Sequence, residues 1–135
     1  MKFSKLGTFC ITALFLFTGC QSSDNAETHI VRGETTSWKA NLEVVFTADR
    51  EMYYVGGSLK SKSDSIPKEV TYFITHSQGG GSGTSRDGNG EYIKIPQGGG
   101  NNPPGDIEAF SEEITLRVEW ESEDGETFNE TIPLD

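Results

Sequence analysis

The sequence predicts an all-β protein, an antiparallel immunoglobulin-like β-sandwich that follows a signal peptide and a flexible tether. In several short segments apolar residues alternate with polar ones, which is the period of a strand with one buried face. Clusters of Gly, Pro, Asp and Asn separate these segments, as turns do. After residue 36 no stretch shows the 3.6-residue period of an amphipathic helix.

The first 19 residues have the pattern of a secretory signal. Lys2 and Lys5 give a positive start, and residues 6–17 form an apolar run of 12 residues without a charge. As a helix this run would rise only about 18 Å, which is short of the roughly 30 Å hydrocarbon layer of a bilayer. Such a run, bounded by small residues, is typical of a signal peptide rather than a membrane span.

The signal ends in Phe17-Thr18-Gly19-Cys20, which resembles the lipobox of bacterial lipoproteins, although Leu, Val or Ile is usual at the position of Phe17. In that family the cysteine receives a diacylglyceryl group and becomes the new amino terminus. The resemblance implies that Cys20 is lipidated, and two acyl chains suffice for stable anchoring. We therefore expect the protein on the extracytoplasmic face of the cell membrane. The alternative is an ordinary signal with an incidental cysteine.

The composition of the remaining 116 residues excludes several classes of function. They hold 9 Lys and Arg against 21 Asp and Glu, a formal charge of −12, whereas nucleic-acid binding needs a basic surface. The acidic residues could attract cations or basic peptides, or form a solvated surface. Cys10 leaves with the signal and Cys20 carries lipid, so a disulfide, a thiol nucleophile and a cysteine metal site are all excluded. No cofactor is predicted.

Residues 20–36 are predicted as the lipidated cysteine and a flexible tether. Residues 21–36 are polar apart from Ile30 and Val31, and a coil of this length spans about 20–24 Å. The sandwich is then assigned to residues 37–135, with Trp38 and Trp120 as core anchors.

Six segments of the domain are predicted as strands. The last two flank Glu123-Asp124-Gly125, which favours a hairpin because Gly tolerates a positive φ. The strands are residues 38–46, 52–59 with a bulge at Gly56-Gly57, 69–77, 91–95, 114–120 and 128–134.

The glycine-rich residues 78–106 are predicted to form a long loop that holds only the short strand 91–95. A phosphate loop is disfavoured because no Gly-Lys-Ser/Thr follows the glycines. Asp87, Asn89 and Glu91 are spaced as calcium ligands on a flexible loop, but Asp-Gly and Asn-Gly are also ordinary turn formers. The remaining interpretations are a recognition loop and a disordered one.

Catalytic candidates are few. His76 is the only histidine of the predicted domain, and a triad could be drawn from His76, Ser77 or Ser82, and Asp87. No nucleophile elbow accompanies them, and adjacency in sequence does not place a serine against its base. Two groups of carboxylates could act as acid and base: Glu112-Glu113, and the set Glu119, Glu121 and Glu123. The three residues of the set would lie on one face of a strand, and a solvated strand face explains their pattern equally well.

The whole layout resembles small lipoproteins of Gram-positive, bacillus-like bacteria, a family without an assigned activity. The shared features are the lipobox, a polar tether, the opening strand SWKANLEVVF and the closing hairpin VEWESEDGETFNETIPL. The resemblance implies an address and a fold, and of functional residues only Cys20. We expect a non-catalytic binding or structural module whose partners are the membrane, through Cys20, and another envelope protein. The alternative is a small hydrolase or metal-dependent enzyme that uses His76 and loop carboxylates.

Overall fold

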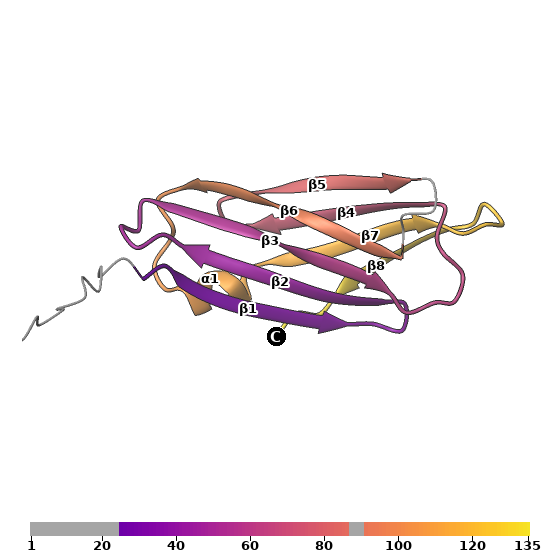
Figure 1. The fold of residues 1–135 in the computed structure, drawn as a ribbon, viewed down its shortest axis with the longest axis horizontal. Helices are drawn as coiled ribbons and strands as arrows, with labels where there is room; N and C mark the ends of the chain where they lie inside the picture. The colour runs from indigo at the N-terminus through magenta and orange to yellow at the C-terminus, as the bar shows by residue number, and fades with distance from the viewer. Residues whose placement is uncertain (1–24, 87–90) are drawn as a thin grey trace, which may run out of the picture.

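The computed structural model describes residues 25–86 and 91–135, which form two four-stranded antiparallel sheets packed face to face (Figure 1). This arrangement confirms the predicted all-β sandwich. The first sheet has the order β1 (Glu27–Glu34), β2 (Trp38–Phe46), β3 (Met52–Ser61) and β6 (Tyr92–Asn101). The second has the order β5 (Gly79–Arg86), β4 (Glu69–His76), β7 (Thr115–Glu121) and β8 (Thr127–Ile132).

The connections form an immunoglobulin-type Greek key with one additional strand. The order β2-β3-β6 matches strands A, B and E, and β5-β4-β7-β8 matches C′, C, F and G. β1 lies outside β2 as an extra edge strand, so each sheet has four strands.

The core lies between the sheets and consists of the alternate side chains of their inner faces. In β2 every second residue from Trp38 to Phe46 is buried, which is the predicted alternation. A fully buried Val, Leu, Ile or Phe contributes roughly 1.5–3 kcal/mol, so these faces hold the sheets together. The largest fully buried side chains are Trp38, Phe46, Phe110, Leu42, Leu59, Leu116, Ile132, Val44, Val70 and Val118.

The predicted bulge in β3 is present and depends on Gly57. The register between β3 and β6 shifts between Val55 and Gly57. Gly57 has φ = 151°, and a Cβ there would collide with the backbone carbonyl oxygen of Asn41. Glycine is therefore required at this position, both for the dihedral angle and for the close approach of β2.

The tether prediction is wrong for residues 27–34, which form β1. They pair with residues 39–46 of β2, from Glu27 opposite Phe46 to Glu34 opposite Lys39. Only Val31 and Gly33 of this strand are buried. Its sequence therefore lacks the alternation of apolar and polar residues by which a strand is recognised. Six residues, not sixteen, thus separate Cys20 from the first strand. Cys20 itself lies outside the described residues.

The short strand predicted at residues 91–95 is confirmed as the start of β6, but the loop predicted for the rest of residues 78–106 is wrong, since β5 and the continuation of β6 to Asn101 occupy much of it. The glycines fit strands because aromatic side chains of the neighbouring strand lie over them. Tyr72 is paired with Gly83 and Tyr53 with Gly100, and a Cβ at either glycine would collide with the opposite tyrosine ring. The tyrosines supply the side-chain packing that glycine lacks.

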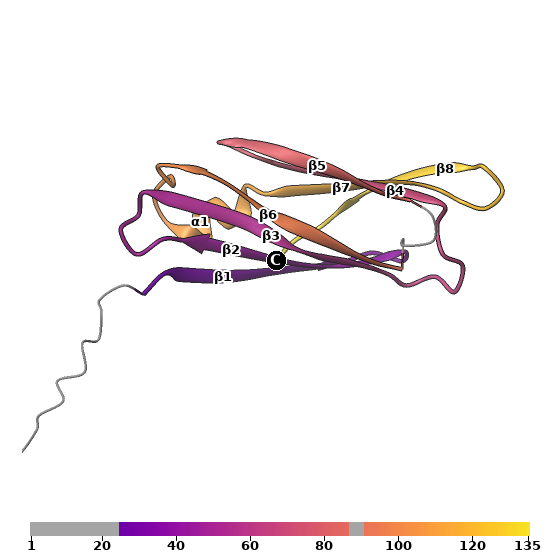
Figure 2. The same ribbon diagram turned by 45° about the horizontal axis from the view of Figure 1, so that its top comes forward.

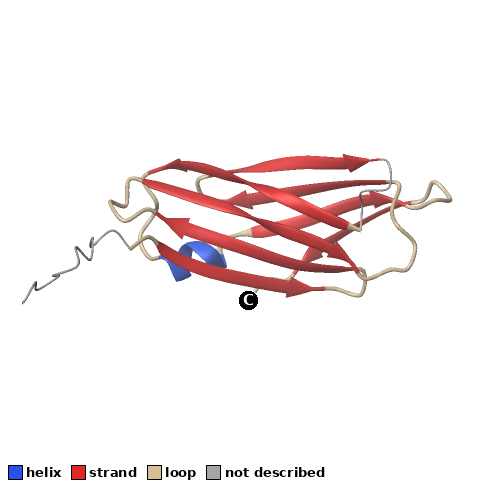
Figure 3. Ribbon diagram, in the orientation of Figure 1, coloured by secondary structure: helices blue, strands red, loops and turns tan. Residues whose placement is uncertain are grey.

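A short helix, α1 (Ile107–Glu112), covers one end of the sandwich and was not predicted (Figure 3). Its six residues bury Ile107 and Phe110, too few turns to show a helical period. Phe110 packs among the rings of Phe46, Tyr53 and His76, with centroids 5.1–5.7 Å apart. Among the described residues, no helix has the length and apolar character that a bilayer span requires.

The bulge can be tested with two glycine variants. Gly57→Ala should destabilise the protein by about 1–3 kcal/mol in urea unfolding, because alanine is strained at this φ and meets the backbone of Asn41. Gly98→Ala is the matched control on the neighbouring β6, where a Cβ meets nothing within 4 Å, and it should change stability by less than about 0.5 kcal/mol. Equal effects of the two variants would contradict this assignment.

Candidate functional site

A pocket of about 530 Å³ opens at the end of the sandwich opposite to the start of β1. This volume lies in the usual range for small-molecule sites. The pocket is built from the β1–β2 turn, the end of β3 with the loop after it, and the β7–β8 hairpin. In Figures 1 and 2 these segments meet at the right-hand end, whereas β1 begins at the left. We call this feature the hairpin-end pocket.

Three aromatic side chains form the apolar part of the hairpin-end pocket. Trp120 and Phe128 are directly opposite each other on β7 and β8, and their rings stack with centroids 5.4 Å apart at 20°. Trp38, at the start of β2, meets Trp120 edge to face at 5.6 Å. Trp38 is buried, with 1% of its surface exposed, whereas Phe128 is 41% exposed. Phe128, stacked on the partly buried Trp120, is therefore the member of this cluster that is open to solvent.

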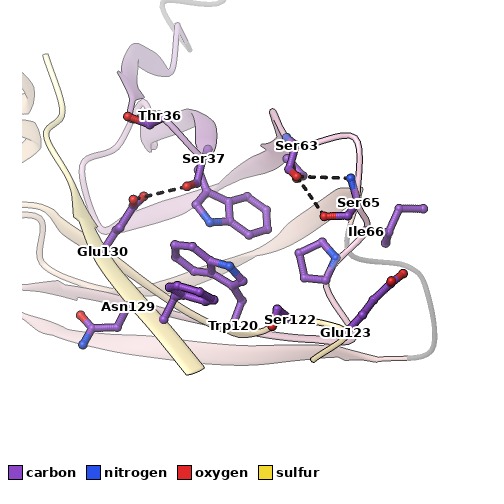
Figure 4. A pocket seen from close by; sticks show the side chains of 14 residues that line it. Thr36, Ser37, Ser63, Ser65, Ile66, Trp120, Ser122, Glu123, Asn129 and Glu130 are labelled. Carbon is purple, nitrogen blue, oxygen red and sulfur yellow. Dashed lines mark hydrogen bonds between the residues drawn. The ribbon is translucent and has the colours of Figure 1, made fainter. Parts of the chain in front are cut away.

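Hydroxyl and carboxylate groups surround the aromatic surface (Figure 4). Glu130 accepts hydrogen bonds from Thr35 Oγ1 at 2.7 Å and from Ser37 Oγ at 3.4 Å, which fixes its carboxylate at the rim. Ser63 and Ser65 are hydrogen-bonded to each other on the opposite side. The 14 lining residues include Glu123 and Glu130 but no Lys, Arg or His, so the pocket carries negative charge.

Two residues that line the hairpin-end pocket each hold a side-chain polar atom that is closed off from solvent and has no hydrogen-bond partner in the described part of the chain. The two atoms are Nε1 of Trp38 and Oγ of Ser122. An unpaired buried donor or acceptor costs about 1–3 kcal/mol, so most such groups in proteins have a partner. Within residues 25–86 and 91–135 these are the only two side-chain atoms in this condition, and both residues line the same pocket.

His76 lies elsewhere, in a second cleft of about 430 Å³ between β5 and β6. Its ring packs edge to face against Tyr53 and Phe110, and its Nδ1 accepts the backbone N–H of Gln78 at 3.2 Å. Burial lowers the pKa of His76 below its ordinary value of 6.5, and the negative charge of Glu113 opposes part of this shift. His76 is thus a packed, neutral end of a strand.

The residues of the imagined triad are not brought together in the described chain. Ser82 is paired with Phe73, whose side chain lies on one face of β4. His76 lies on the other face of β4, together with Tyr72 and Ile74. Because successive side chains point to opposite faces, Ser82 and His76 lie on different sides of the sheet. Neither Ser77 nor Ser82 forms a hydrogen bond with His76 in the described residues. Asp87 lies outside them.

The other candidate carboxylates do not form a site either. Glu119 forms an ion pair with Arg117, whose guanidinium lies 4.3 Å from the ring centroid of Phe73. Glu112 and Glu113 are exposed at the end of α1.

Of the cation candidates, Glu91 is an exposed residue just before β6, and its backbone carbonyl accepts the N–H of Ser61. Asp87 and Asn89 lie outside the described residues. In the described segments, no group of three His, Cys, Asp or Glu side chains is arranged to hold a metal ion.

No protein-family model, curated protein or solved structure matches this chain.

The sequence contained a signal for the aromatic part of the hairpin-end pocket that the sequence analysis did not use. The Glu123-Asp124-Gly125 turn sets the register of β7 and β8, and this register places Phe128 opposite Trp120. The serines could not be found in the same way, because Ser63 and Ser65 belong to an irregular loop whose course no periodicity predicts.

The lowered pKa of His76 predicts a pH dependence of stability. The unfolded chain binds the imidazole proton more readily than the folded one does. The contribution of neutral His76 to the free energy of unfolding is therefore fully present above pH 6.5 and is lost as the pH falls through the folded pKa. Urea unfolding should show stability decreasing from pH 7.5 to pH 5. In His76→Phe, which keeps an aromatic ring, this decrease should be smaller; in the control His29→Gln it should persist. An unchanged slope in His76→Phe would assign the effect to other groups.

Proposed function

We propose that this protein is a membrane-anchored, extracytoplasmic lipoprotein that acts as a non-catalytic binding module at the cell envelope. In this proposal Cys20 carries the lipid and the hairpin-end pocket is the binding site. The observation that carries it is the pocket itself, where the exposed ring of Phe128 stacks on Trp120 and hydroxyl and carboxylate groups lie around the two rings.

The position of the pocket suits a module attached through its amino-terminal end. β1 begins at Glu27 and reaches the pocket end at Glu34, and eight residues of strand span about 26 Å. Because six residues separate Cys20 from β1, at full extension they allow at most about 25 Å between the lipid and the domain. The anchor would then lie near one end of the sandwich, with the pocket directed away from the membrane.

The chemistry of the pocket favours binding over catalysis. Its lining has neither a histidine nor a cysteine, so the usual base that activates a hydroxyl nucleophile and the usual thiol nucleophile are not among the lining residues. Of its two carboxylates, Glu130 is already hydrogen-bonded to Thr35 and Ser37. These groups can orient a ligand, and we assign them that role.

The signal and the lipobox residues Thr18, Gly19 and Cys20 support the anchor, as does the resemblance to small lipoproteins of Gram-positive, bacillus-like bacteria. The mature chain would have a formal charge of −12, which disfavours contact with anionic lipid and keeps the domain off the membrane surface.

Replacement of the proposed lipidation site tests the anchor. Cys20→Ser should abolish the diacylglyceryl mass of the amino-terminal peptide and prevent cleavage before residue 20, because the thiol that receives the lipid is gone. The measurement is mass spectrometry of that peptide from the membrane fraction. A wild-type peptide with a free thiol, or with residues 1–19 attached, would contradict the anchor.

The extracytoplasmic location can be tested on intact cells with Ser63→Cys, which places a thiol at the hairpin-end pocket. A membrane-impermeant maleimide should label this variant and leave the wild type unlabelled, because Cys20 is blocked by lipid in both. Labelling of Ser63→Cys only after cell lysis would contradict an extracytoplasmic location.

A further inference from the structure

The charged side chains that line the hairpin-end pocket are both acidic. Glu123 and Glu130 are among its lining residues, which include no Lys, Arg or His. Of the basic residues next to the lining loop in sequence, Lys62 is held by the carboxylate of Glu34 at 2.6 Å, and the exposed Lys68 does not line the pocket. The pocket therefore attracts cations and repels phosphate and carboxylate groups.

Glu130 is a half-buried negative charge whose partners in the described chain are uncharged. Its carboxylate accepts hydrogen bonds from the hydroxyl groups of Thr35 and Ser37. The four ion pairs within residues 25–86 and 91–135 all involve other carboxylates. Because a charge interacts more strongly where water is partly excluded, Glu130 favours a cationic group on the ligand.

Phe128 presents an aromatic ring beside this carboxylate. Phe128 and Glu130 are two residues apart on β8, so their side chains lie on the same face of the strand, about 6.6 Å apart along it. Stacking on Trp120 covers one face of the Phe128 ring, and 41% of the residue remains exposed. A cation can therefore lie against the ring and reach the carboxylate at the same time.

The protein forms such an arrangement elsewhere with an arginine of its own. The guanidinium of Arg117 lies 4.3 Å from the ring centroid of Phe73 and forms an ion pair with Glu119. The hairpin-end pocket supplies the ring and the carboxylate, and its lining supplies no cation.

The shape of the site favours arginine over lysine. A guanidinium is planar, so one face can stack on Phe128 while the N–H groups at its edge bond to Glu130, whereas an ammonium is compact and strongly hydrated. Figure 4 shows Glu123 and Glu130 on opposite sides of the Trp120 ring, so a second basic residue of the same segment can meet Glu123.

We infer that the hairpin-end pocket binds an arginine side chain from a basic peptide segment of another exported protein, with the guanidinium stacked on Phe128 and bonded to Glu130. This inference rests on the proposed function, in which the pocket is the binding site, and it names the chemistry of the partner.

The test uses 15N-labelled mature lipoprotein in nanodiscs of neutral phosphatidylcholine. The probes are the blocked peptide Gly-Arg-Gly-Arg-Gly, its lysine counterpart and its citrulline counterpart, in which a neutral urea group replaces the guanidinium. The protein's two tryptophans, Trp38 and Trp120, both line the pocket, so their indole N–H signals report binding there. The arginine peptide should shift the Trp120 signal with a Kd of about 1 mM or tighter, the lysine peptide should bind about threefold more weakly, and the citrulline peptide about tenfold more weakly.

Two variants remove the proposed contacts one at a time. Phe128→Leu keeps an apolar side chain but loses the ring, and Glu130→Gln keeps an acceptor oxygen for Thr35 but loses the charge. Each should weaken binding of the arginine peptide about threefold to tenfold. Tyr92→Leu and Glu43→Gln are the matched controls, since they remove an exposed ring and an exposed carboxylate that do not line the pocket. Both controls should bind as the wild type does.

The preference for arginine separates a ligand contact from a structural role. If Phe128 only supported the shape of the pocket, Phe128→Leu would weaken the arginine and lysine peptides equally. If the ring stacks on a guanidinium, the variant loses the preference for arginine. An unchanged preference in Phe128→Leu, equal binding of the arginine and citrulline peptides, or equal effects of Glu130→Gln and Glu43→Gln would each overturn the inference.

A crosslinking experiment distinguishes failure of the proposed function. A photocrosslinker attached to Ser63→Cys at the pocket should capture a partner on intact cells, the same label at Tyr92→Cys should not, and the arginine peptide should suppress the capture. Capture that the peptide leaves unchanged would overturn the arginine inference and leave the pocket as a binding site. No capture together with no binding of any peptide would overturn both.

Discussion

The edge-to-face contact between Trp38 and Trp120 determines how the two sheets meet at one end of the molecule. Trp38 begins β2 in the first sheet and Trp120 lies near the end of β7 in the second, so this contact joins the layers directly. Trp38 is enclosed by its neighbours, whereas Trp120 is only partly buried. The hairpin-end pocket opens beside this contact between the sheets.

The two ends of the sandwich each carry an aromatic cluster but differ in what covers it. At the end where β1 begins, Phe46, Tyr53 and His76 are closed over by Phe110 of α1. At the other end, no helix of the described chain covers Trp38, Trp120 and Phe128. The covered cluster is part of the core, whereas in the other cluster Trp38 is buried, Trp120 is partly buried and Phe128 is exposed to solvent. This asymmetry separates a stabilising end from an end available for binding.

The sequence predicts the fold well where both rules of a strand apply together, alternation and a defined turn. β2, β4 and the β7–β8 hairpin satisfy both, so their extent was close to the prediction. β1 fails the first rule because only Val31 and Gly33 of its residues are buried. β5 and the second half of β6 fail it because their inward positions are largely glycines, whose packing is supplied by Tyr72 and Tyr53 on neighbouring strands, whereas Ile93 and Ile95 made the first half of β6 predictable.

The candidate site was predictable only in its aromatic part. Trp38 and Trp120 stand out in the sequence by size and position, and the hairpin register adds Phe128. The unpaired state of Trp38 Nε1 depends on which groups from distant segments come near it. Local sequence patterns carry no information about such long-range contacts, so the chemistry of the pocket had to come from the structure.

The pairing of β1 also has a mechanical consequence. A pull on the start of β1, against a ligand held at the opposite end of the sandwich, acts along the strand axis. The hydrogen bonds to β2 run perpendicular to that axis, so all eight residue pairs resist the force together in shear. The backbone bonds between Arg32 and Asp135 add resistance at the far end of the strand. Tension along this line would have to rupture the ladder as a whole rather than unzip it one rung at a time.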